Sequence, residues 1–249
     1  MTLKQKLNWL SSIPSTTGSE EKIINRLTSW VEENNYLPVN IARKNQVDPL
    51  GVLPRDSKEL KTIFLAHVDR KQVSSRKLHF LGSCVAGQLD NIIGISAVME
   101  VLKRNPENKN FGVLFTTEEE ILKSGEQITE FVERYANAGT YIVDVDIDPI
   151  TSGTALYKGI SIRKNDSRRS FSADPLIETA KDMKVRYMSL DSWLLCQMTL
   201  LADTLENPTV FTGLPILNYH SNKEIAYYPS LKNLVKVLDG LLKREGGLA

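Results

Sequence analysis

The stretch "TIFLAHV", residues 62–68, is a nearly continuous apolar run with the length of one β-strand. Such a run is typical of a strand that is buried on both faces, as in the centre of a parallel sheet. Its end carries His67, and Asp69 follows two residues later. One of the three histidines of the chain therefore lies where a core strand ends, which indicates either a packed ring or a ligand site.

Strands and helices alternate on either side of this stretch. Apolar runs predict strands at 111–117 ("FGVLFTT"), 140–147 ("TYIVDVDI") and 213–221 ("GLPILNYHS"), and helical spacing predicts helices at 92–104 and 124–136. This order predicts an α/β fold, a three-layer sandwich with a mostly parallel, mixed central sheet and helices on both faces. We expect residues 1–249 to form a single domain.

The N-terminal part predicts two helices and a pair of strands. Residues 2–12 form the first predicted helix. Thr17 and Glu20 have the spacing of a capping box and predict the start of the second, which ends before Pro38. Residues 38–53 predict a strand, a turn and a strand around "DPLG".

Composition limits the class of partner. Lysine plus arginine number 31 against 30 acidic residues, a net charge of +1 that predicts neither nucleic acid nor an anionic membrane as partner. Cys84 and Cys196 form no C-x-x-C motif, which fits two packed thiols in a reducing compartment. The N-terminus lacks a signal-peptide pattern, and the apolar stretch 193–202 is too short to span a bilayer. We expect a cytoplasmic protein.

Ionisable residues follow the predicted buried strands. In an open parallel sheet, such residues meet at the carboxyl ends of the strands. The residues in question are His67, Asp69, Asp90, Glu118, Glu119, Glu120, Asp144, Asp146 and His220. Gathered without cations, this set would be strongly self-repelling, because buried like charges are costly.

Divalent metal removes this conflict. Imidazole nitrogens with carboxylate oxygens suit zinc, with cobalt or manganese as alternatives, and two ions about 3.5–4 Å apart can share one carboxylate. Each residue also has an ordinary structural explanation. His67 or His220 could be a packed ring, the three glutamates a solvated helix start, and Asp90 an N-cap.

The combined order is more specific than its parts. H-x-D, then D-N with a glycine three places on, then E-E after a strand, an aspartate and a distal histidine resemble the co-catalytic di-zinc exopeptidases. The segments "IPSTTGSEEKI" (13–23), "DPLGVL" (48–53) and "YHSNKEIAYYPSLKNLVKVL" (219–238) resemble the tetrahedral, glutamyl aminopeptidase type. The resemblance thus extends over nearly the whole chain.

The resemblance implies a set of metal ligands. His67 and Asp144 correspond to ligands of one ion, Glu120 and His220 to ligands of the other, and Asp90 to the bridge. The implied cofactors are two divalent ions, with zinc first and cobalt or manganese as alternatives.

The resemblance also implies roles for residues beside the ions. Glu119 corresponds to the general base. Asp69 would accept a hydrogen bond from His67 and fix the tautomer of that ring. The family tends to have a cis peptide after the bridging aspartate, here Asp90–Asn91.

The chain departs from the family in several places. Relatives usually have a glycine near Leu122, and the three glutamates 118–120 leave the register open by one residue. Asp146 is an alternative to Asp144, because both lie on the same face of one strand. Only a short segment joins His67 to Asp90, where relatives insert a lid or dimerisation domain, so we expect a catalytic domain alone.

The expected function is that of a metallo-aminopeptidase, an enzyme that hydrolyses the N-terminal residue of a peptide or a small amide. A deacylase or carboxypeptidase is the first alternative. It would need cations for a substrate carboxylate, and the basic loop offers Arg163, Lys164, Arg168 and Arg169. A non-catalytic, metal-containing peptide-binding protein is the second alternative. Residue specificity, the native metal and the oligomeric state stay open.

Overall fold

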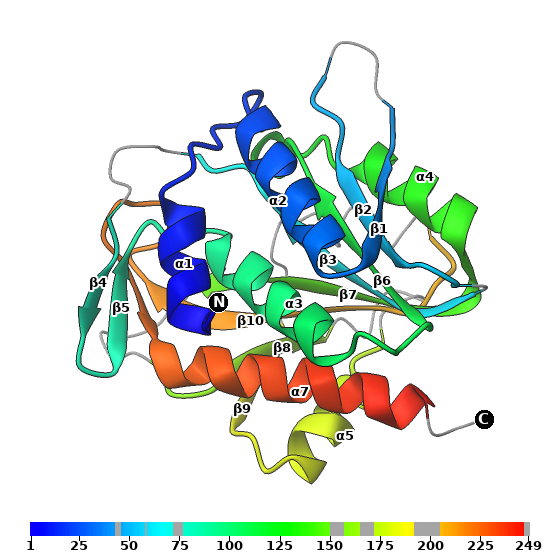
Figure 1. Cartoon of the computed structure of the whole chain (residues 1–249). Coiled ribbons are helices and arrows are strands. Elements are labelled where there is room, and N and C mark those ends of the chain that lie inside the picture. The colour runs from blue at the N-terminus through cyan, green and yellow to red at the C-terminus, as the bar shows by residue number, and fades with distance from the viewer. Residues whose placement is uncertain are drawn as a thin grey trace.

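The computed structural model describes residues 1–42, 46–57, 59–71, 77–149, 157–164, 172–191 and 205–246, which form an α/β fold around one large sheet (Figure 1). The eleven strands lie in the order β1-β2-β6-β3-β7-β10-β11-β5-β4, with β8 beside β10 and β9 beside β8. The strands are β1 (Tyr36–Asn40), β2 (Leu50–Pro54), β3 (Leu60–His67), β4 (His79–Leu81), β5 (Cys84–Gly87), β6 (Phe111–Thr116), β7 (Ala136–Pro149), β8 (Ile160–Lys164), β9 (Tyr187–Asp191), β10 (Thr209–Leu217) and β11 (Glu224–Tyr227).

The centre of the sheet is parallel. β6, β3, β7 and β10 are neighbours and run in the same direction, so their carboxyl ends lie at one edge. Antiparallel strands extend the sheet on both sides, β2 and β1 next to β6 and β11, β5 and β4 next to β10. The predicted fold class is confirmed.

β3 shows why its sequence is apolar throughout. Phe64 and Ala66 face the core on one side of the sheet, whereas Ile63 and Leu65 face the core on the other, and all four side chains are fully buried. Both sets contribute because a central strand has no solvated face. The run "TIFLAHV" therefore reflects burial on two sides rather than the alternation of a half-buried strand.

Helices cover both faces (Figure 1). The larger core is shared by α1 (Leu3–Ser11), α2 (Glu21–Glu33), α3 (Ile92–Arg104), α5 (Asp174–Asp182) and α7 (Tyr228–Gly246). The opposite core is covered by α4 (Gly125–Tyr135), which contributes Ile128 and Phe131. A short 3-10 helix, η1 (Glu119–Ile121), follows β6.

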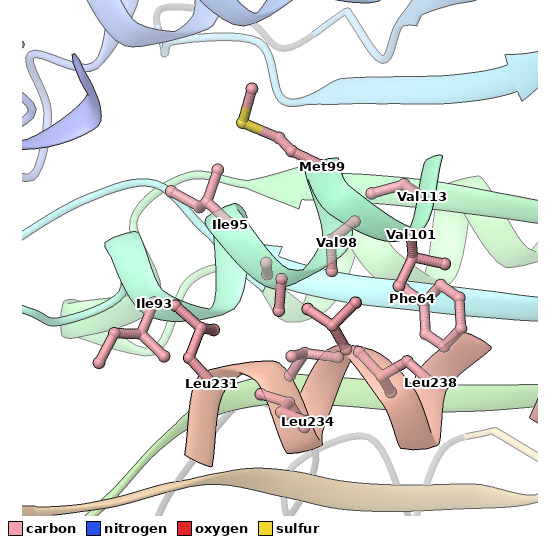
Figure 2. Close-up of a cluster of buried hydrophobic side chains, with 14 of the residues drawn as sticks. Phe64, Ile93, Ile95, Val98, Met99, Val101, Val113, Leu231, Leu234 and Leu238 are labelled. Carbon is pink, nitrogen blue, oxygen red and sulfur yellow. The ribbon is translucent and has the colours of Figure 1, made fainter. Parts of the chain in front are cut away.

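α3 is fixed by apolar contacts on several sides. Figure 2 shows its side chains Ile93 and Val98 in one cluster with Leu231 and Leu234 of α7 and with Phe64 of β3. Truncating such a fully buried leucine to alanine typically costs about 2–5 kcal/mol. α3, which begins two residues after Asp90, is therefore a rigid element beside that residue.

The predicted capping box at the start of α2 is wrong. α2 begins after Glu20 without a hydrogen bond from a capping side chain. The Thr17 hydroxyl instead donates to Asp69, and the Glu20 carboxylate accepts from the backbone N–H groups of Gly18 and Glu118. A capping box occurs at α1, between Thr2 and Gln5. The spacing alone could not reveal that Thr17 and Glu20 form hydrogen bonds with residues at the carboxyl edge of the sheet.

The predictions on the cysteines, on membrane spans and on the domain organisation have different outcomes. Cys196 and the apolar stretch 193–202 are outside the described residues, whereas Cys84 is a free, partly buried thiol. Among the described helices, none combines the length and apolar character needed to cross a bilayer. That residues 1–249 form one catalytic domain without a lid stays a prediction.

Candidate metal centre

The carboxyl edge of the parallel strands gathers the predicted residues. His67 is the last residue of β3, and Glu119 and Glu120 open η1 directly after β6. Asp146 lies near the end of β7, and His220 follows β10. Asp90 lies two residues before the start of α3, and the expected cis peptide between Asp90 and Asn91 is present.

His67, Asp90 and Asp146 form what we call the buried group. His67 Nε2 lies 3.0 Å from Asp90 Oδ1 and 3.3 Å from Asp146 Oδ1. All three residues are buried, and their ligand atoms lie within 4.8 Å of one another. Convergence of one imidazole and two carboxylates at this spacing is suited to a divalent cation.

Asp90, Glu120 and His220 form what we call the exposed group. His220 Nε2 lies 3.4 Å from Asp90 Oδ2 and 3.3 Å from Glu120 Oε2. Asp90 belongs to both groups, with one oxygen facing His67 and the other facing His220. This is the arrangement that a bridging carboxylate requires.

Asp144 does not lie in either group, although the sequence favoured it as a ligand; the structure places Asp146 there instead. β3 and β7 pair in parallel with Leu65 opposite Asp144. Two residues further along both strands, His67 comes level with Asp146 and not with Asp144. The side chain of Asp144 is buried within electrostatic reach of Glu119.

Asp69 organises the surroundings of His67. Its main-chain carbonyl oxygen lies 3.0 Å from His67 Nδ1, and because a carbonyl only accepts, this contact assigns the proton to Nδ1 and leaves Nε2 to face the buried group. Its carboxylate accepts the backbone N–H groups of Glu119 and Glu120, each at 3.1 Å, and the hydroxyl of Thr17 at 3.0 Å. Asp69 therefore fixes a tautomer and orients the segment that carries both glutamates.

Burial and mutual repulsion shift the ionisation of the acidic residues. Burial raises the pKa of Glu119 well above its ordinary value, with Asp146 and Asp90 adding to the shift. Burial, together with Asp90, raises the pKa of Glu120 to about 7, and burial also raises the pKa of Asp146. Burial opposes the ionised form of Asp90 too, but His67 and His220 outweigh it and lower its pKa to about 2.

The histidines are shifted in the complementary direction. Burial opposes the charged form of His67, but Asp146, Glu119 and Asp90 outweigh burial and hold its pKa well above the ordinary value. The pKa of His220 is raised as well, because Asp90 and Glu120 outweigh its burial. Without metal, protons thus take the place of cations among these carboxylates.

The donor set fits divalent metal. Within the described part of the chain, Glu120 Oε1 is buried without a hydrogen-bond partner. Asp90 Oδ1 and His220 Nε2 face only other members of the two groups, at 3.0 Å and at 3.3–3.4 Å. Buried polar atoms normally have a partner, and a cation held by each group would be a partner for all three atoms.

Two glutamates beside the buried and exposed groups were not predicted as site residues. Both accept hydrogen bonds from backbone N–H groups. Glu224 Oε2 accepts from Leu89 N (2.6 Å) and Asp90 N (3.1 Å), and burial, together with Asp90, raises its pKa to about 7. Glu20 Oε1 accepts from Gly18 N (3.0 Å) and Glu118 N (3.2 Å). The available signal was the presence of both residues inside the segments that resemble the family.

Two glycines allow β7 to be approached closely at the level of Asp146. A Cβ atom on Gly94 of α3 would lie 2.2 Å from the carbonyl oxygen of Val145, and one on Gly213 of β10 would lie 2.2 Å from that of Asp146. Neither distance is possible between non-bonded atoms. Glycine is therefore required at both positions for α3 and β10 to lie where they do.

The backbone is strained at Leu122, near which the family resembled in sequence usually has a glycine. Leu122 adopts a φ of 59°, in the left-handed region that favours glycine. The turn after the glutamates thus keeps a glycine-like conformation with a leucine in it.

Arg163, which the sequence assigns to a basic loop, lies in strand β8 instead. Its guanidinium donates to the carboxylate of Asp148 in a buried ion pair, with Nε 3.0 Å from Oδ2. Arg168, Arg169 and the side chain of Lys164 lie outside the described residues. Arg163 therefore gives no support to recognition of a substrate carboxylate.

This is an open α/β fold with polar groups at the carboxyl edge of its parallel strands, the edge at which such folds generally bind their ligands. No family model matches the chain, and no curated protein matches it in sequence. Solved structures do share the fold. The Pyrococcus horikoshii TET1 peptidase superposes with a TM-score of 0.75 at 17% identity, over 97% of this chain and 99% of that one.

Two further structures are similar. An aminopeptidase from the archaeon Desulfurococcus kamchatkensis has a TM-score of 0.77 at 11% identity, over 97% of this chain and 94% of its own. The aminopeptidase PepT from Bacillus cereus has a TM-score of 0.77 at 11% identity, over 98% of both chains. The chain therefore has the fold of these peptidases, as the resemblance in sequence predicted.

Proposed function

We propose that the protein is a metal-dependent exopeptidase that hydrolyses the N-terminal residue of a peptide. The observation that carries this proposal is the pair of ligand groups that share Asp90, with Glu119 beside them. The names of the similar structures, aminopeptidases and a peptidase, support the same class. The proposed cofactors are two divalent ions, with zinc first and cobalt or manganese as alternatives, held by His67, Asp90, Asp146, Glu120 and His220.

The proposed chemistry assigns one task to each side chain. Divalent ions, when bound, supply Lewis acidity to a water molecule and to the scissile carbonyl. Glu119 takes the proton of the attacking water and passes it to the leaving amine. Asp69 holds the backbone of Glu119 and the ring of His67 in place.

The first experiment compares hydrolysis of fluorogenic peptides with free and with blocked amino groups, together with metal analysis. We expect about two ions per chain and turnover of the free-amine substrates only. Preferential turnover of blocked peptides would instead favour the deacylase or carboxypeptidase. Two bound ions without hydrolysis of any substrate would favour a peptide-binding protein. A cytoplasmic location stays a prediction from the sequence.

The second experiment tests the assignment of the base. Glu119→Gln should lower kcat by about 100- to 10,000-fold, the usual contribution of a general base, and leave the metal content unchanged. Glu118→Gln is the matched control, since Glu118 is an equally buried neighbour. Full activity of Glu119→Gln would contradict the assignment. Loss of activity in Glu118→Gln alone would shift the register by one residue.

A further inference from the structure

Glu224 lies between two of the three residues of the exposed group, Asp90 and His220. It is the first residue of β11 and is almost fully buried. Its Oε2 accepts the N–H groups of Leu89 and Asp90, at 2.6 and 3.1 Å. The backbone N–H of His220 lies near the same carboxylate. A single side chain thus binds the segment of the shared ligand Asp90 and lies beside the segment of His220.

Neither segment is positioned by regular secondary structure at these residues. Asp90 precedes α3, and His220 follows the end of β10. Asn218 and His220 have φ values of 58° and 56°, so the chain turns sharply on the way to the imidazole. A charged acceptor of backbone N–H groups is a strong way to hold such segments, because hydrogen bonds to ionised groups are shorter and stronger than neutral ones.

β11 is itself well placed for this task. It pairs with β10 on one side and with β5 on the other, and Glu224 lies opposite Gly87 of β5. Gly87 is close in sequence to Leu89 and Asp90, whereas β10 leads to His220. The carboxylate therefore projects from the strand that lies between the two segments it joins.

We propose that Glu224 is a positioning residue of the metal centre, which holds Asp90 and His220 at the separation at which both face one cation. This inference rests on the metal pair of the proposed function. It predicts that Glu224 affects the exposed group more than the buried group. The buried group would keep His67 and Asp146, which Glu224 does not contact in the described structure.

Glu20 provides a matched control. It is a buried glutamate that accepts two backbone N–H groups, as Glu224 does. Its partners Gly18 and Glu118 belong to neither group. Removal of the Glu20 carboxylate therefore changes burial and charge in a similar way but removes no hydrogen bond from a ligand residue itself.

The test measures Mn²⁺ binding to the metal-free full-length chain by titration calorimetry and by electron paramagnetic resonance. For the unaltered protein we expect two ions that are magnetically coupled. Glu224→Ala should bind the first ion normally, bind the second about 100-fold more weakly and lose the coupled signal, as expected when groups that orient ligands are removed. Glu224→Gln keeps an acceptor oxygen and should stay within about 10-fold.

Glu20→Ala should bind both ions with the coupled signal, which separates loss of positioning from loss of a buried charge. If Glu224→Ala does not fold, Glu224→Asp takes its place, because the carboxylate is then one methylene too short to reach both segments. Normal affinity and coupling in a folded Glu224→Ala or Glu224→Asp would overturn the inference. Two coupled ions without peptide hydrolysis would instead overturn the proposed function and leave this inference standing.

Discussion

The buried and exposed groups share Asp90 but differ in how their histidines are held. The side chain of His67 is 1% exposed, ends a central strand and has its Nδ1 bonded to the Asp69 carbonyl. The side chain of His220 is 26% exposed and follows a left-handed turn. Its ring stacks on the half-exposed Tyr219, with the centroids 3.7 Å apart, and its Nδ1 lies 3.3 Å from Lys71 Nζ.

Because of this difference, the two groups should differ in how readily their histidine Nε2 atoms bind metal. In the buried group, the Asp69 carbonyl holds the proton on His67 Nδ1, so Nε2 is the nitrogen that would give up its proton to a metal ion. In the exposed group, the Lys71 ammonium donates to Nδ1, which favours a proton on Nε2. We therefore expect the buried group to bind the first ion and the exposed group the second.

Removal of either histidine should have the largest effect on metal affinity. In His67→Ala the tighter ion should be lost, with affinity reduced by more than the roughly 100-fold limit for groups that only orient ligands. In His220→Ala one ion should remain bound at its normal affinity. Metal analysis after dialysis and calorimetric titration would measure both. Retention of the tighter ion by His67→Ala and its loss from His220→Ala would reverse the comparison.

Replacement of the two aspartates of β7 sharpens the assignment within the buried group. Asp146→Asn should weaken the first ion by about 100-fold, because one anionic ligand becomes neutral. Asp144→Asn, a change of the same kind two residues away, should leave two ions bound. The measurement is a Zn²⁺ titration against a competing chelator. A stronger effect of Asp144→Asn would restore the expectation from the sequence.

The pH dependence of stability should differ in sign with and without metal. Glu120 and Glu224 have pKa values of about 7 in the fold, against an ordinary 4.5, and the pKa of His67 is raised as well. A group with a raised pKa stabilises the fold fully below its unfolded pKa, and this contribution is lost as the pH rises through the folded value. The metal-free protein should therefore become less stable as the pH rises from about 4.5 through about 7.

For a chain of this size, a decrease of about 2 kcal/mol in the free energy of unfolding lowers the melting temperature by about 4–8 °C. With Zn²⁺ the trend should reverse, because metal requires deprotonated ligands. Thermal unfolding followed by circular dichroism, with chelator or with Zn²⁺, would measure this. A metal-free protein that gains stability over the same range would contradict the charge balance described for the two groups.

The smallest expected effect is at Lys71. Lys71→Met removes the hydrogen bond that opposes the ligating tautomer of His220, and a single hydrogen bond contributes about 0.5–1.5 kcal/mol. The affinity for the second ion should therefore rise by about 3- to 10-fold, with no change for the first. Calorimetric titration resolves a change of this size. A decrease for the second ion would show that Lys71 supports the exposed group.

The sequence predicted the elements of the fold well, because burial dictates them. The strand at 62–68 and the helix at 92–104 follow from apolar patterns that the two cores explain directly. That most of the proposed ligands lie close together was also predicted, since the carboxyl ends of parallel strands meet at one edge. What the pattern could not supply was the register between neighbouring strands, and Asp144 and Asp146 differ only in that register.

The partners of other residues could not be predicted, because they are distant in the sequence. Thr17 and Glu20 have the local spacing of a cap but bond to Asp69 and Glu118. Arg163 looked like part of a basic loop but pairs with Asp148. In each case a local pattern competed with a long-range partner, and the long-range partner prevailed because a buried polar group must be satisfied.

Gly213 has a consequence for how this protein tolerates change. A methyl group at this position would force β10 away from β7 at the level of Asp146, since it would meet the Asp146 carbonyl at 2.2 Å. The same strand leads to His220, so one displacement would disturb a residue of each group at once. A library that samples every amino acid at position 213 should therefore return glycine alone as the metal-competent variant, although this residue offers no atom for a metal to bind.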